Sequence, residues 1–124
     1  MVAALWCVGG FRDLAVYRRA VGLADALHAS VGGWPGFDRF TVGTQLVRAA
    51  DSVGANIAEA YGRWGPKDQR RALHIARGSA YEMAHWVERA EARHLALPDS
   101  ALEEAHEISR MLNGLIASHR APRN

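Results

Sequence analysis

The chain has 124 residues, the size of a single domain, and carries 15 basic and 13 acidic side chains for a mild net charge of +2. Hydrophobic residues make up 49% and charged residues 23% of it, a composition that excludes a disordered chain. The single cysteine, Cys7, excludes an internal disulfide framework and suits a reducing compartment.

Residues 1–10 are apolar, but they are too few to span a membrane, which takes about 20 residues, and no basic segment precedes them as in a secretory signal. We interpret residues 1–12 as an N-terminal tail, residues 13–120 as one domain and residues 121–124 as a C-terminal tail. We expect a cytoplasmic protein that does not insert into membranes.

Apolar residues recur at alternating steps of three and four along four stretches, which predicts four helices. The first follows Asp13, a favourable N-cap, and ends at Gly32. The second runs from about Asp38 to Tyr61. Their apolar seams are Tyr17, Ala20, Ala24, Leu27 and Val31 in the first helix, and Leu46, Ala50, Val53, Ile57 and Tyr61 in the second.

The third helix opens at Pro66, a residue favoured at the first helical position, and the fourth follows Pro98 with Asp99 or Ser100 as its cap. Their seams are Leu73, Ala76, Ala80, Met83, Val87, Ala90 and His94 in the third helix, and Ala101, Ala105, Ile108, Leu112, Leu115 and His119 in the fourth. No stretch alternates with a period of two, so no strand is expected.

Short connections make neighbouring helices antiparallel, so the predicted fold is an all-α, up-down four-helix bundle. Alanines are frequent in the seams, and each buries little apolar area, which predicts a thin core. A small bundle with a thin core favours stabilisation by oligomerisation, so we expect a homo-oligomer.

A polar stripe runs along the second helix beside its apolar seam. At 100° per residue its members cluster on one side of the helix: Gln45, Arg48, Ser52, Asn56, Glu59 and Arg63. The stripe has three interpretations: a solvated face, a subunit interface specified by polar groups, or a site for a simple i, i+4 ion pair between Glu59 and Arg63.

Three segments resemble one known family in both residues and order. They are Phe11-Arg12-Asp13-Leu14-Ala15-Val16-Tyr17, the long run Gln45-Leu46-Val47-Arg48-Ala49-Ala50-Asp51-Ser52-Val53-Gly54-Ala55-Asn56-Ile57-Ala58-Glu59-Ala60-Tyr61-Gly62-Arg63, and Ala76-Arg77-Gly78-Ser79-Ala80-Tyr81-Glu82. Together they resemble the 23S rRNA intervening-sequence proteins. The resemblance implies a four-helix bundle that assembles as a ring, often a pentamer, with no known enzyme activity and with nucleic-acid association as a family-level expectation.

The start of the third helix is basic on the side opposite its seam, where its candidate nucleic-acid-binding residues are Lys67, Arg70, Arg71, His74 and Arg77. Cations near a helix N-terminus oppose the helix dipole, and a locally unfavourable choice can indicate function. The alternative is an ordinary solvated face. Trp64, just before this face, is either a base-stacking aromatic or a cap on the bundle end.

Two Glu-x-x-His pairs, Glu82 with His85 and Glu103 with His106, have the spacing of metal ligands in some helical bundles. Helical-wheel angles turn both pairs away from the seams, so we predict no metal site and no cofactor. The sequence has no phosphate loop, dinucleotide fingerprint or nucleophile elbow, so we predict no catalytic residue and no enzyme activity.

These observations favour a non-enzymatic, oligomeric bundle, pentameric by its resemblance, that associates with nucleic acid. We expect RNA as the ligand, with DNA as the other candidate. The alternative is an oligomeric scaffold that binds another protein and has no nucleic-acid role.

Overall fold

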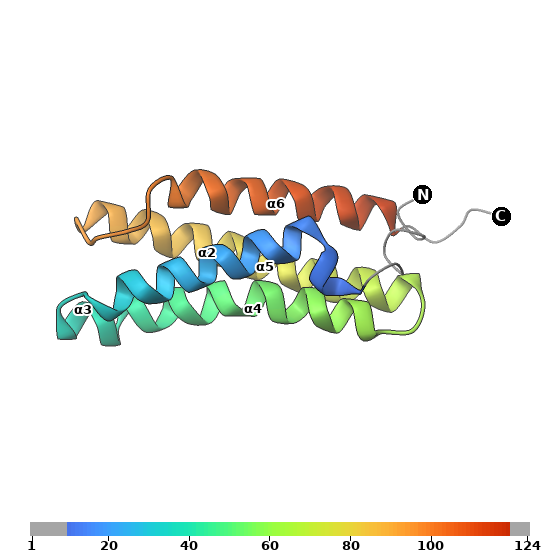
Figure 1. Cartoon of the computed structure of the whole chain (residues 1–124), viewed down its shortest axis with the longest axis horizontal. Helices are drawn as coiled ribbons and strands as arrows, with labels where there is room; N and C mark the ends of the chain where they lie inside the picture. The colour runs from blue at the N-terminus through green and yellow to red at the C-terminus, as the bar shows by residue number, and fades with distance from the viewer. Residues whose placement is uncertain (1–9, 120–124) are drawn as a thin grey trace.

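The computed structural model describes residues 10–119, and within them the secondary structure is entirely helical. Long helices of alternating direction lie side by side in this range (Figure 1): α2 (Ala15–Gly32), α4 (Val42–Gly62), α5 (Pro66–Ala92) and α6 (Ala101–Ser118). A 3-10 turn, η1 (Phe11–Asp13), precedes α2, and a short helix, α3 (Gly36–Phe40), joins α2 to α4. The predicted up-down four-helix bundle is confirmed.

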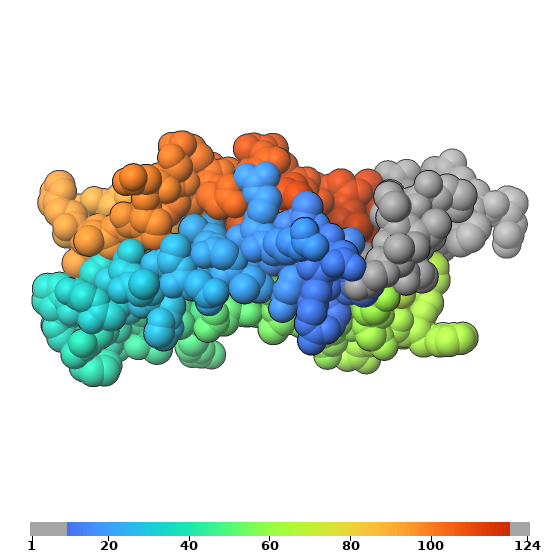
Figure 2. Space-filling view, in the orientation of Figure 1, coloured from blue at the N-terminus to red at the C-terminus, as the bar shows by residue number. Residues whose placement is uncertain are grey.

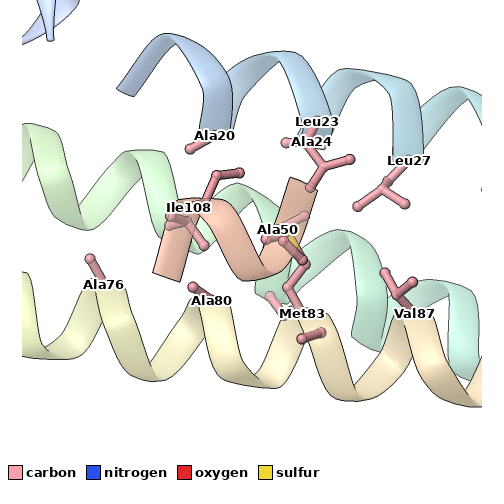
Figure 3. Packing of buried hydrophobic residues seen from close by; sticks show 14 of the residues in the cluster. Ala20, Leu23, Ala24, Leu27, Ala50, Ala76, Ala80, Met83, Val87 and Ile108 are labelled. Atoms are coloured by element: carbon pink, nitrogen blue, oxygen red, sulfur yellow. The ribbon is translucent and has the colours of Figure 1, made fainter. Parts of the chain in front are cut away.

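The core lies along the bundle axis and is built from all four long helices. Leu27, Leu46, Met83 and Ile108, one from each helix, are fully buried. Figure 3 shows alanines of α2 pointing toward alanines of α5 across the core. Of the 27 buried hydrophobic residues in the described range, twelve are alanines, so the helices approach closely but each contact removes little apolar area from water.

The predicted seams are buried except near their ends. His94 is exposed, contrary to its predicted seam position, because α5 ends at Ala92 and His94 has a left-handed φ of 57° in the following turn. In α6 Ile116 is buried, whereas Leu115 is only half-buried. His119, just beyond the end of α6, is buried as predicted. The predicted seams are therefore accurate in the middle of each helix and vary at the ends.

Two predicted helix ends are wrong. Asp13 is not the N-cap of α2: it lies in η1, and its carboxylate pairs with Arg18 at 3.1 Å. The predicted helix from Asp38 to Tyr61 is interrupted at Thr41, whose φ of −108° and ψ of −91° separate α3 from α4. The start of α5 at Pro66 is confirmed.

The start of α6 differs in detail from the predicted cap. Of the two predicted caps, Asp99 and Ser100, the structure has Ser100 as the N-cap residue. Its φ of 58° is left-handed. Its side chain makes no capping hydrogen bond. The helix therefore starts without the hydroxyl contact that a serine cap usually provides.

Close packing joins the turns at the α3 end of the bundle. Trp34 is buried, and its indole Nε1 donates to the carbonyl oxygen of Ala96 at 2.7 Å, which ties the α2–α3 turn to the α5–α6 connection. Gly43, at the start of α4, lies so close to α2 that an added Cβ would be 2.6 Å from Cγ1 of Val31. Only glycine fits at this position without a rearrangement.

At the opposite end η1 packs on the bundle. The ring of Phe11 makes edge contacts with Tyr17 at 5.0 Å and Tyr61 at 6.0 Å between centroids. Phe11, which belongs to the predicted N-terminal tail of residues 1–12, is thus in contact with the helices. Residues 1–9 and 120–124 lie outside the described range. In residues 10–119 no helix combines the length and the apolar character needed to cross a membrane.

Candidate nucleic-acid interface

The predicted basic residues line the first three turns of α5. Arg70 and Arg77 are half-buried, and Lys67, Arg71 and His74 are exposed. All of them except Arg77 surround one shallow surface depression of about 500 Å³, which Asp68 also lines. The steps of three and four between them place them on one side of the helix because α5 is continuous there. The structure therefore brings the predicted set together on one surface.

Arg77 differs from the others because it is held by neighbouring side chains. Its Nη1 donates to Oδ1 of Asn113 on α6 at 2.8 Å, and its Nη2 donates to Nδ1 of His74 at 3.1 Å. Its guanidinium also lies 5.9 Å from the ring centroid of Tyr81. Arg77 thus connects α5 to α6 and orients His74, which leaves it less able to reach a ligand than its neighbours.

The remaining cations of the face have no ionic partner in the described range. Between residues 10 and 119, ion pairs form at Arg18, Arg19, Arg63 and Arg110, but no carboxylate lies within 4 Å of a charged nitrogen of Lys67, Arg70 or Arg71. The three cations repel one another, and Lys67 in the first turn also opposes the helix dipole, although Asp68 of the same turn offsets part of this repulsion. An anion bound among them would relieve both effects.

Trp64 lies in the turn between α4 and α5, beside the start of the basic face. Gly65 takes a φ of 86°, which glycine adopts readily, and Pro66 then begins α5. The side chain projects away from the bundle, since Trp64 is 94% exposed. Trp64 therefore does not cap the bundle end, and the stacking interpretation remains.

The polar stripe of α4 divides into an inner and an outer part. Ser52 and Asn56 are half-buried against α5: Oγ of Ser52 lies 2.8 Å from Oγ of Ser79, and Nδ2 of Asn56 donates to Oγ of Ser52 at 2.9 Å. These contacts are made within one chain. The middle of the stripe is therefore a contact between two helices of the same chain. Neither a solvated face nor a subunit interface predicts this.

The ends of the stripe face outward. Gln45 and Arg48 are exposed. Arg63 donates to Glu59 at 2.9 Å, so the predicted i, i+4 ion pair is confirmed, with both side chains about half exposed. Such an exposed pair adds little to stability. The subunit interface stays a prediction that now concerns mainly Gln45 and Arg48.

The two Glu-x-x-His pairs lie on the surface, as the wheel angles predicted, with Glu82, His85, Glu103 and His106 all exposed. Glu82 accepts a hydrogen bond from Nε1 of Trp86 at 3.1 Å. In the described part of the chain, no three histidine, cysteine, aspartate or glutamate side chains gather in a way that could hold a metal ion. The four residues of the two pairs thus lie apart on the surface rather than together inside the bundle.

Sequence reasoning missed a second surface feature, at the α3 end. Phe37 and Phe40 of α3 are 80% and 72% exposed. With Trp86 and Arg93 they line a groove of about 630 Å³ beside the start of α4. The signal in the sequence is the i, i+3 spacing of the two phenylalanines, of which only Phe40 lies within the helix predicted from about Asp38. The groove is aromatic and has no arrangement of catalytic groups.

Comparison with known proteins agrees with this fold. A solved structure described as a protein of unknown function from the S23 ribosomal protein family of Bacteroides thetaiotaomicron superimposes with a TM-score of 0.73. It is 23% identical, and the match covers 82% of this chain and 98% of that one, so the likeness concerns the fold. No curated protein matches the chain.

A family model extends the comparison to the sequence. It matches residues 12–114, which include most of the bundle and the three segments on which the resemblance rests, apart from Phe11 at the start of the first. The chain belongs to the family of 23S rRNA-intervening sequence proteins.

Proposed function

We propose that the protein is a non-enzymatic nucleic-acid-binding protein that contacts phosphates through the basic face of α5, defined by Lys67, Arg70, Arg71, His74 and Arg77. The observation that carries this proposal is that Lys67, Arg70 and Arg71, which form no ion pair in the described range, surround one depression. Arginine and lysine in this arrangement suit phosphate oxygens.

The face supports binding of low sequence specificity. Phosphate contacts position a protein on nucleic acid, and sequence is read by contacts to base edges. The basic face of α5 offers cations, whereas its buried face packs against α4 and α6. Because a single copy carries few cations, each chain should bind weakly.

We further propose that several copies assemble, which would repeat the basic face and raise the apparent affinity through effective concentration. The alanine-rich core and the exposed Gln45 and Arg48 support assembly. The pentamer implied by the family resemblance is the expected size.

The test is binding of labelled RNA and DNA at low and moderate salt. Wild type should bind at low salt, with the logarithm of the affinity falling by roughly 0.7 to 0.9 per phosphate contacted for each tenfold rise in salt. Arg70→Gln with Arg71→Gln should flatten that slope by roughly one to two. The control is Arg89→Gln with Arg93→Gln, which removes the same charge near the other end of α5. No binding at low salt, or equal effects of both double variants, would refute the proposal.

A second candidate is a protein-binding scaffold, which the groove lined by Phe37, Phe40 and Trp86 favours. Exposed aromatic side chains of this kind are frequent in protein interfaces. Phe37→Ser with Phe40→Ser should abolish partner capture if this function holds, and should leave nucleic-acid binding unchanged if the first one holds.

A further inference from the structure

We propose that the nucleic acid bound by the basic face is single-stranded, with one of its bases stacked on the indole of Trp64 while its phosphates follow Lys67, Arg70 and Arg71. This inference rests on the proposed function. It adds the class of ligand and a contact that the basic residues alone do not provide.

The exposure of Trp64 is unlike that of the other described tryptophans. Trp34 is buried and Trp86 is half-buried, and each donates a hydrogen bond through Nε1. Within residues 10–119 Trp64 makes no hydrogen bond and no ring contact. A tryptophan side chain gains from burying its large apolar surface, so its position in water is the less stable one unless a partner covers it.

The position of Trp64 relative to the cations fits one strand. Trp64 precedes Pro66 by two residues, and at 1.5 Å per residue Lys67, Arg70, Arg71 and His74 lie within about 12 Å of the start of α5. Successive phosphates of one strand in a stacked helix advance about 3.4 Å along its axis, so this axial length corresponds to about three or four of them. One short stretch of nucleic acid can therefore reach the indole and the cations together.

Within residues 10–119 the side chain of Trp64 is open to a ligand at one end of the bundle, since it is 94% exposed. Figure 1 places the α4–α5 turn at one end of the bundle, and in Figure 2 atoms of this yellow-green region project beyond the adjacent helices. Flat access from outside is what a base needs in order to lie on an aromatic ring. A side chain packed along the flank of the bundle would not offer it.

Stacking on Trp64 selects against an intact duplex. In a double helix the faces of the bases are already covered by their neighbours, so an aromatic side chain reaches them only at ends, loops or gaps. Unpaired bases expose these faces, and every base has one, so the preference is for strand state rather than sequence. A duplex would keep the phosphate contacts and gain nothing from Trp64.

The experiment measures fluorescence anisotropy of a labelled 20-nucleotide strand, as RNA and as DNA, and of the matching duplexes, at 50 mM salt. Trp64→Leu should weaken binding of both single strands by about 5- to 100-fold and change duplex binding less than twofold. Trp64→Phe should retain most of the affinity. The salt slope should be the same in all of these variants, because stacking neutralises no phosphate.

The matched control is Phe40→Leu, which removes an exposed aromatic ring from the opposite end of the bundle and should leave both affinities unchanged. An unchanged Tm of Trp64→Leu verifies folding. Equal losses for single strands and duplexes, or no loss, would overturn the inference. If the inference fails but Arg70→Gln with Arg71→Gln still lowers affinity, the proposed nucleic-acid-binding function survives. If the wild type binds no strand at all, both the proposed function and the Trp64 inference are refuted.

Discussion

Arg19 on α2 and Glu104 on α6 form a bidentate ion pair that joins the first and last long helices of the bundle. Nε of Arg19 donates to Oε2 of Glu104 at 2.9 Å, and Nη2 donates to the other carboxylate oxygen. Residues 85 positions apart in sequence are thus connected by a geometry that suits arginine better than lysine. The other ion pairs of the described range lie within five residues of sequence.

This pair makes stability depend on pH in the acid range. The hydrogen bond from Arg19 lowers the pKa of Glu104 below its ordinary value of 4.5, while partial burial opposes the shift. The stabilisation is therefore fully present well above the ordinary pKa and is lost as pH falls through the lower folded-state pKa. Arg19, whose pKa the same hydrogen bond raises, stays protonated throughout.

We expect Glu104→Gln to lower the Tm at pH 7, and we expect its difference from wild type to shrink as the pH is lowered from 7 through the depressed pKa of Glu104 in the folded chain. Thermal unfolding followed by circular dichroism across this range provides the measurement. Glu103→Gln, an exposed neighbour with no ion pair in the described range, is the control. A Tm difference that stays constant with pH would contradict the assignment.

Gly43 should be intolerant of a methyl group. Gly43→Ala places Cβ against Val31 and is expected to lower the free energy of unfolding by about 1–3 kcal/mol through overpacking. Gly78→Ala, inside α5 with open space around its Cβ, should instead raise it by about 0.4–1 kcal/mol. Urea unfolding of both variants gives the comparison, and a neutral Gly43→Ala would show that α2 and α4 can separate at little cost.

The assembly proposal predicts a solution mass several times the chain mass of 13.5 kDa, with five copies expected. If the outward end of the α4 stripe is the interface, Arg48→Glu should reduce that mass more than Arg110→Glu, which reverses a charge on α6. Multi-angle light scattering at micromolar concentration measures it. A stable monomer of the wild type would refute assembly altogether.

Within the basic face, Arg70 and Arg77 should behave differently. Arg70→Gln removes an unpaired cation and should reduce the salt slope of nucleic-acid binding by about 0.7 to 0.9. Arg77→Gln instead breaks the contact with Asn113, so it should lower the Tm while changing the slope by less than half as much. Titrations at four salt concentrations, beside thermal melts, separate the two effects. Equal slopes for both variants would show that Arg77 also reaches phosphate.

The bundle itself was predictable because its signals are local and repeated. The seam through Leu73, Met83 and Val87 predicts a helix regardless of what packs on it, and Pro66 marks its start. The errors fall where tertiary contacts decide. Thr41 interrupts a helical pattern at the turn where Gly43 packs on Val31, and Asp13 pairs with Arg18 instead of capping α2.

The sequence was enough to predict which residues share the basic face, but not which side chains they contact. Spacing alone gathers Lys67, Arg70 and Arg71 on one side of α5, but that Arg77 is tied to Asn113 depends on where α6 lies. Likewise a helical wheel places Ser52 on the polar side of α4, yet its contact with Ser79 depends on the neighbouring helix. The exposure of Trp64 depends on the path of the turn, which no periodic pattern encodes.

The up-down topology has a practical consequence for how the protein is handled. Because α2 begins and α6 ends at the same end as the α4–α5 turn, a tag fused to either terminus is joined to the bundle at the end that carries the surface proposed to meet nucleic acid (Figure 1). A basic purification tag there would add its own charge to every titration. Binding should therefore be measured on protein from which the tag has been cleaved, with probes attached at the α5–α6 connection at the far end.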